Sequence, residues 1–152
     1  MIVGKSADLV NGAAVAPTTA MTPEQLRART KKFAVDAIRV GKAVPKDPIN
    51  DEIVTQLTDA ASSGAAAYRS ARRARSRADV IYKLGNSIEE IDEAAFWLEV
   101  LSESGILPAS TTTPLWREAD ELTRIVVSSR ETTRSNQPGN RQSRNHQSRN
   151  HQ

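Results

Sequence analysis

Residues 62–101 constrain the fold of this chain more than any other stretch, because they read as a helix end, an arginine-rich turn and a whole second helix. In that second helix, apolar side chains recur every three or four residues over about five turns, which is the period of one helix face. The face consists of Val80, Ile81, Leu84, Ile88, Ile91, Ala95 and Leu98. A stripe of this length has to be buried against other helices, which favours an all-α fold.

Two helices are predicted before this one. The first covers residues 23–44, because Thr22 and Gln25 fit a capping box with proline at the first helical position. The second starts at Pro48 behind an Asp47 cap. Its apolar line is Ile49, Ile53, Leu57, Ala60, Gly64, Ala67 and Ala71. The small residues in the second half of this line would let a neighbouring helix approach closely.

The third helix is predicted to start at Ser76, with Asp79 three residues later, and to end before Gly105. Thr113 with Pro114 is expected to open the fourth helix. Its apolar stripe is Leu115, Ala119, Leu122, Ile125 and Val126. Strand-like alternation is absent from the sequence, so the four amphipathic helices predict an antiparallel up-down four-helix bundle.

The bundle is assigned to residues 21–133. Residues 1–20 lack a hydrophobic period and are expected to be a disordered leader, with Met21 as a candidate natural start. Residues 134–152 contain no aliphatic side chain and repeat QSRNH twice in tandem. Such a tail has no apolar surface to offset its ordering entropy, so we expect it to be disordered.

The net charge of +3 comes from this tail. Four of the chain's 21 lysines and arginines lie in residues 134–152, which contain no acid, whereas all 18 acids lie before residue 134. The predicted bundle is therefore close to neutral. Only a local cluster of bases, and not the overall charge, can support nucleic-acid binding by the bundle.

Several function classes find no support in the sequence. No apolar run is long enough for a membrane span, no signal peptide is recognisable, and there is no cysteine, so a cytoplasmic location is expected. The only histidines, His146 and His151, lie in the tail, which leaves the bundle without a catalytic triad or a di-iron ligand set. We therefore predict a protein that is not an enzyme and holds no metal or cofactor.

The best candidate for binding is a group of arginines at the turn between the second and third helices, here called the basic corner. Its members are Arg69, Arg72, Arg73, Arg75 and Arg77. Three interpretations remain open: a solvated turn, a contact with RNA or DNA phosphates, and salt bridges to acids of a neighbouring subunit. The acid-rich residues 89–103 favour the salt bridges. Cations near a helix N-terminus are unfavourable unless anions bind to them, which favours a contact with phosphates or with a partner's carboxylates.

A second candidate is an aromatic patch on the third helix, formed by Tyr82, Phe96, Trp97 and Val100. These side chains project away from the apolar stripe, and residues 94–101 are apolar on nearly every side. An exposed patch of this kind is typical of an interface, so self-association is predicted. The alternative is ordinary packing beneath the fourth helix or Trp116.

Residues 60–107 resemble a known family, and the resemblance extends over about residues 21–133. The pattern "S-x-x-A-N-Y-R-E-A", a serine-capped "D-F-I-x-K" and "K-E-A-D-E-x-x-Y-W-L-E-L-L" is typical of the four-helix bundle proteins encoded in intervening sequences of bacterial 23S rRNA. The matching positions are Ser63, Ala66, Tyr68, Arg69, Ala71, Asp79, Ile81, Lys83, Glu90, Asp92, Glu93, Trp97, Leu98 and Glu99. The chain departs from it at Ala67, where asparagine is usual, and at Ser70, where glutamate is usual.

This resemblance implies a homopentamer of bundles. It also implies kinship with the accessory variability determinant of diversity-generating retroelements, a basic bundle that engages nucleic acid and a reverse transcriptase. Taken with the residues, it predicts a self-assembling accessory factor that binds RNA, DNA or a reverse-transcriptase-like enzyme through the basic corner. A structural or protein-interaction module with inter-subunit salt bridges is the alternative.

Overall fold

The computed structural model describes residues 20–136, and in that range the regular structure is entirely α-helical. The elements are α1 (Pro23–Ala43), α2 (Pro48–Ala71), α3 (Arg77–Glu103) and α4 (Ala109–Ser135). The all-α prediction is therefore confirmed for this part of the chain. Most of the predicted leader and tail lies outside the described residues, although α4 continues to Ser135, past the boundary predicted at residue 133.

Side-chain caps start the first three helices where the sequence predicted them. Thr22 and Gln25 form both bonds of the capping box at α1, at 3.1 and 2.8 Å. Asp47 accepts a hydrogen bond from the Ile49 amide at α2, and Ser76 accepts one from the Asp79 amide at α3. Each cap satisfies an amide that has no partner within its helix.

The predicted start of α4 is wrong by one turn. The helix begins at Ala109, behind Pro108, and Pro114 lies inside it rather than at its first position. Proline at 114 removes one amide from the helical hydrogen bonds, and the carbonyl that loses its donor belongs to Ser110, whose residue is exposed. Burial of Thr112 ahead of the proline shows that this early turn already packs on the bundle.

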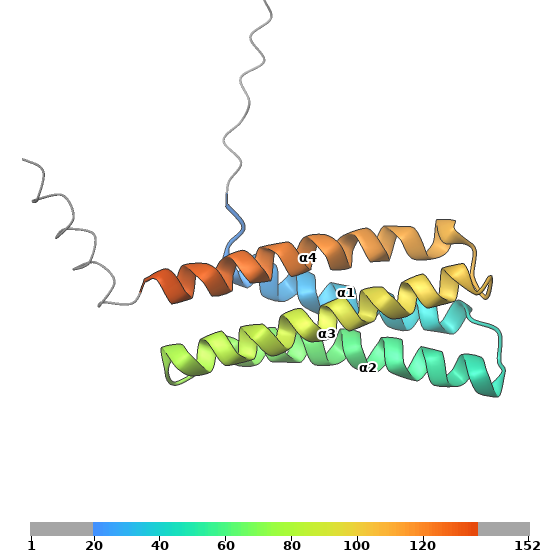
Figure 1. The fold of residues 1–152 in the computed structure, drawn as a ribbon, viewed down its shortest axis with the longest axis horizontal. Coiled ribbons are helices and arrows are strands. Elements are labelled where there is room, and N and C mark those ends of the chain that lie inside the picture. The colour runs from blue at the N-terminus through green and yellow to red at the C-terminus, as the bar shows by residue number, and fades with distance from the viewer. Residues whose placement is uncertain (1–19, 137–152) are drawn as a thin grey trace, which may run out of the picture.

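The helices form an up-down bundle in which each runs opposite to its neighbour (Figure 1). α2 packs against α1 and α3, and α4 packs against α3 and α1, which closes the bundle. α1 and α3 therefore lie at opposite corners. The core contains mainly leucine and alanine, and Phe33 is its largest fully buried side chain. Within residues 20–136, no helix has the length and apolar character needed to cross a bilayer.

Most of the predicted stripes form this core, with one clear exception. Leu57, Ala60 and Gly64 are buried on α2 as expected, but Ile49 is 73% exposed. Ile49 lies in the first turn of α2, before Ile53, which is the first residue of the line to pack on the core. A helical stripe read from sequence does not show how far the partner helices extend along it.

Candidate functional site

The basic corner lies at one end of the bundle. Arg69 is in the last turn of α2, Arg72 caps that helix, and Arg77 is the first residue of α3. Between them the chain makes a tight turn, held by hydrogen bonds from the Arg73 amide to the Ser70 carbonyl at 2.9 Å and from the Ala74 amide to the Ala71 carbonyl at 3.2 Å. Because the turn is short, all five arginines stay within a small region.

Four of these side chains are exposed, and Arg77 is half-buried. Within residues 20–136 none of the five takes part in an ion pair. The acid closest along the chain, Asp79, pairs instead with Lys83 at 3.0 Å. Arg77 also holds a buried Nη1 without a hydrogen-bond partner in that range. The described part of the protein therefore provides no ion-pair partner for the positive charge of the corner.

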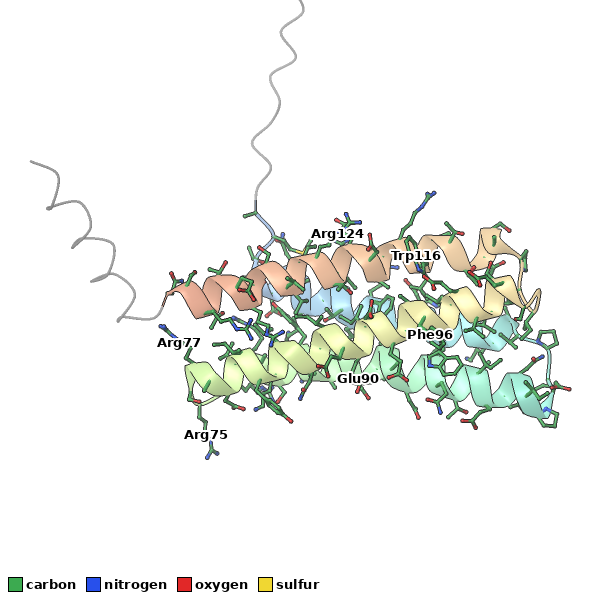
Figure 2. All side chains as sticks on the ribbon, in the orientation of Figure 1. Arg75, Arg77, Glu90, Phe96, Trp116 and Arg124 are labelled. Carbon is green, nitrogen blue, oxygen red and sulfur yellow. The ribbon has the colours of Figure 1, made fainter. Side chains whose placement is uncertain are left out.

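The arginines of the corner are not gathered around one described cavity. Arg75 and Arg77 extend from the same end of the bundle in different directions (Figure 2). A cavity of about 330 Å³ lies nearby, lined by residues from all four helices, and Arg72 is the charged residue in its wall. Tyr68 forms part of the same wall, and burial raises the pKa of its hydroxyl.

A second basic surface, which the sequence reasoning missed, continues from the corner along α1. A groove of about 420 Å³ between α1 and α2 is floored by alanines and bordered by Arg27, Lys31 and Arg69. Glu24 also borders it, but this acid pairs with Arg27 at 2.7 Å. Arg69 belongs to both surfaces, so positive charge runs from the corner into the groove. The four-residue spacing of Arg27 and Lys31 was the available sequence signal.

The opposite charge collects on α3. Glu89, Asp92, Glu93, Glu99 and Glu103 are exposed there. Glu90 is half-buried, and its pKa is raised by desolvation and by the neighbouring charges of Glu93 and Glu89. Among residues 20–136, no three or more histidine, cysteine, aspartate or glutamate side chains are arranged so that they could hold a metal ion. No cation lies among these carboxylates in the described part of the chain, so their like charges repel one another.

The structure divides the aromatic patch into two kinds of side chain. Tyr82 and Phe96 are 67% and 53% exposed, and Val100 is half-buried. Trp97 packs against the core. Phe96 meets Trp97 edge to face at 5.0 Å between ring centres. Tyr82 and Phe96 therefore present the most apolar surface outward, whereas Val100 and Trp97 are both half-buried.

Beside the patch, α3 and α4 enclose a groove of about 270 Å³ that contains Phe96 and Trp116 (Figure 2). Trp116 donates a hydrogen bond from Nε1 to Glu99 at 2.7 Å, and Trp97 donates one to Glu93 at 3.3 Å. Trp116 flanks Phe96, which remains 53% exposed. Packing beside α4 therefore covers Phe96 only in part.

Fold and surface together define an all-α four-helix bundle with a basic end and an acidic, aromatic outer helix. No family model and no curated protein matches the sequence. Among solved structures, the chain is similar to a protein of unknown function from the S23 ribosomal protein family of Bacteroides thetaiotaomicron VPI-5482. The match has a TM-score of 0.65 and 23% identity, and it covers 73% of this chain and 99% of that protein. It supports the four-helix fold.

Proposed function

We propose that this protein acts by binding rather than by catalysis, and that its basic corner holds the phosphate backbone of RNA or DNA. The observation that carries this proposal is the group of five arginines without an ion-pair partner among residues 20–136. Guanidinium groups pair with phosphate oxygens in a two-pronged geometry, and each contact releases condensed counterions from the nucleic acid.

Local stability accounts for only part of this arrangement. Arg69 is favoured by the C-terminal end of the α2 dipole, but Arg75 and Arg77 lie at the start of α3, where the dipole disfavours a cation. Like charges gathered in one turn also repel one another. Bound phosphates would remove both penalties.

The proposal includes self-association, with a homopentamer as the assembly that the family resemblance implies. Its support is the outward aromatic surface of α3, because large exposed apolar side chains are typical of interfaces. The same resemblance makes a reverse-transcriptase-like enzyme a candidate partner and a cytoplasmic location the expected one.

The test measures binding of a single-stranded RNA and of a DNA duplex as a function of salt. The protein used is the full chain with Arg141, Arg144 and Arg149 changed to glutamine, which leaves Arg134, paired with Glu131, as the only arginine of residues 134–152. Binding should weaken steeply between roughly 50 and 200 mM salt. Changing Arg72, Arg73 and Arg75 to glutamine should reduce the slope of log Kd against log salt by about 3, or abolish binding.

The matched control changes Arg39, Arg117 and Arg124 to glutamine, which removes the same charge from exposed positions elsewhere. Binding should then persist. If the parent has no affinity at about 50 mM salt, where screening is weakest, phosphate binding is refuted. If the corner substitutions instead dissociate the assembly, the arginines pair with acids of a neighbouring subunit.

A further inference from the structure

We infer that the outer face of α1 on one copy of this chain docks on the outer face of α3 on another, so that copies join head to tail. The inference rests on the self-association proposed above, and it names the surface that covers Phe96. α1 and α3 occupy opposite corners of the bundle, each packed against α2 and α4, so one chain presents both faces at once (Figure 1).

The outer face of α1 carries an apolar pair between two lysines. Lys31, Val35, Ile38 and Lys42 follow one another at spacings of four, three and four residues, which aligns them along one side of the helix. All four residues are exposed, with Val35 at 38% and Ile38 at 42%. Two neighbouring aliphatic side chains on an outer helix face are apolar surface that the described bundle leaves uncovered.

The outer face of α3 carries the same arrangement with the opposite charge. Glu93, Phe96, Val100 and Glu103 follow at spacings of three, four and three residues. Phe96 is 53% exposed, Val100 is half-buried, and both glutamates are exposed. Here too an apolar pair lies between two charged side chains (Figure 2 shows Phe96 projecting from α3).

The two stripes agree in length. At about 1.5 Å of rise per residue, Lys31 and Lys42 lie about 16 Å apart along the axis of α1, and Glu93 and Glu103 about 15 Å apart along α3. When the helices lie side by side, each lysine can therefore reach a glutamate while Phe96 contacts the aliphatic pair.

The charges are also free to pair between copies. Lys31, Lys42, Glu93 and Glu103 make no ion pair within residues 20–136. Beside the α1 stripe, Lys32 and Arg39 both pair with Asp36, which leaves a net positive charge there. Beside the α3 stripe, Glu89 and Asp92 are exposed acids.

This complementarity favours one mode of assembly over another. A two-fold contact of α3 with α3 would place glutamates against glutamates, and a contact of α1 with α1 would place lysines against lysines. Like charges facing each other across an interface oppose both arrangements. A contact between two different faces is heterologous, and it forms a ring when its rotation closes.

The test reverses the charge of each stripe in the full chain and measures the molar mass by light scattering. The α1 reversal is Lys31→Glu with Lys42→Glu, and the α3 reversal is Glu93→Lys with Glu103→Lys. Either reversal alone should weaken assembly at least tenfold and shift the mass toward the 16.6 kDa of one chain. The chain that carries both reversals is complementary again and should regain the mass of the parent.

The matched control is Arg117→Glu with Arg124→Glu, which makes the same charge change as the α1 reversal on exposed positions of α4. It should leave the mass unchanged, and circular dichroism should show the same helicity for every variant. A parent chain that is a monomer would overturn both this inference and the self-association proposed above. An assembled parent whose mass withstands the single reversals, or whose double reversal stays dissociated, would overturn this inference alone.

Discussion

Gly64 of α2 lies so close to Ile91 of α3 that a Cβ on the glycine would be 2.8 Å from Ile91 Cγ1. At the same place, the Ser87 hydroxyl donates a hydrogen bond to the Gly64 carbonyl oxygen at 2.8 Å, and both Ser87 and Ile91 are fully buried. The missing side chain is therefore what lets the two backbones approach. This contact aligns α3, and with it the basic corner at one end and the aromatic patch toward the other.

Replacing Gly64 by alanine should destabilise the bundle. Overpacking against a fully buried isoleucine costs about 1–3 kcal/mol, and alanine regains about 1 kcal/mol of helix propensity. We expect a net loss of about 1 kcal/mol, measured as a lower midpoint of urea unfolding. Gly85→Ala is the control, because a Cβ there meets the Arg130 guanidinium carbon at 3.5 Å, an ordinary contact. A Gly64→Ala protein as stable as Gly85→Ala would contradict the close approach.

The ion pair between α1 and α4 predicts a second effect on stability. Arg29 donates two hydrogen bonds to Glu118, at 2.6 and 2.7 Å, and also contacts Glu121 at 2.9 Å. Glu118→Gln should lower the free energy of unfolding by about 1 kcal/mol, because the pair is only partly buried and Glu121 still partners the arginine. Glu121 is more exposed, so Glu121→Gln should have the smaller effect in the same urea titration.

Much of the fold could be read from the chain because its signals are local. The caps at Thr22, Asp47 and Ser76 need only neighbouring amides, and the stripe of α3 needs only its own period. The start of α4 was misplaced because Pro114 looks like a first helical residue in sequence. The start of α4 is set by the packing of the preceding turn on the bundle, which is a tertiary effect.

The candidate site was less predictable, because charge pairing and exposure depend on distant residues. Sequence placed the five arginines together, but only the structure shows that Asp79 pairs with Lys83 and leaves them unanswered. The sequence groups Trp97 with Phe96, because both project away from the apolar stripe, yet Trp97 packs against the core. The outward pair of Val35 and Ile38 could not be predicted, because the exposure of an aliphatic side chain depends on which helices pack around it.

The acidic face of α3 predicts a dependence of stability on pH. The pKa of Glu90 is raised above its ordinary value of 4.5, so folding favours its protonated form. Its contribution to stability is therefore present below 4.5 and is lost as the pH rises through the higher pKa of the folded state. Glu90→Gln should raise the melting temperature at about pH 7 and leave it nearly unchanged at about pH 3.5. Glu52→Gln is the control for the loss of one charge. Equal shifts of the melting temperature at both pH values for Glu90→Gln would refute this prediction.

Phe96 and Trp97 are adjacent in sequence and in contact, but they should respond differently to substitution. Phe96 is 53% exposed, so Phe96→Glu should leave helicity and the melting of a single chain nearly unchanged while dissociating the assembly. Trp97 packs on the core, so Trp97→Ala should lower the unfolding free energy of the single chain by about 2 kcal/mol, less than the ~3–5 kcal/mol of a fully buried site. Light scattering and thermal melting of both variants, each at several protein concentrations, separate the two effects. An assembly that survives Phe96→Glu would show that the aromatic patch lies outside the interface.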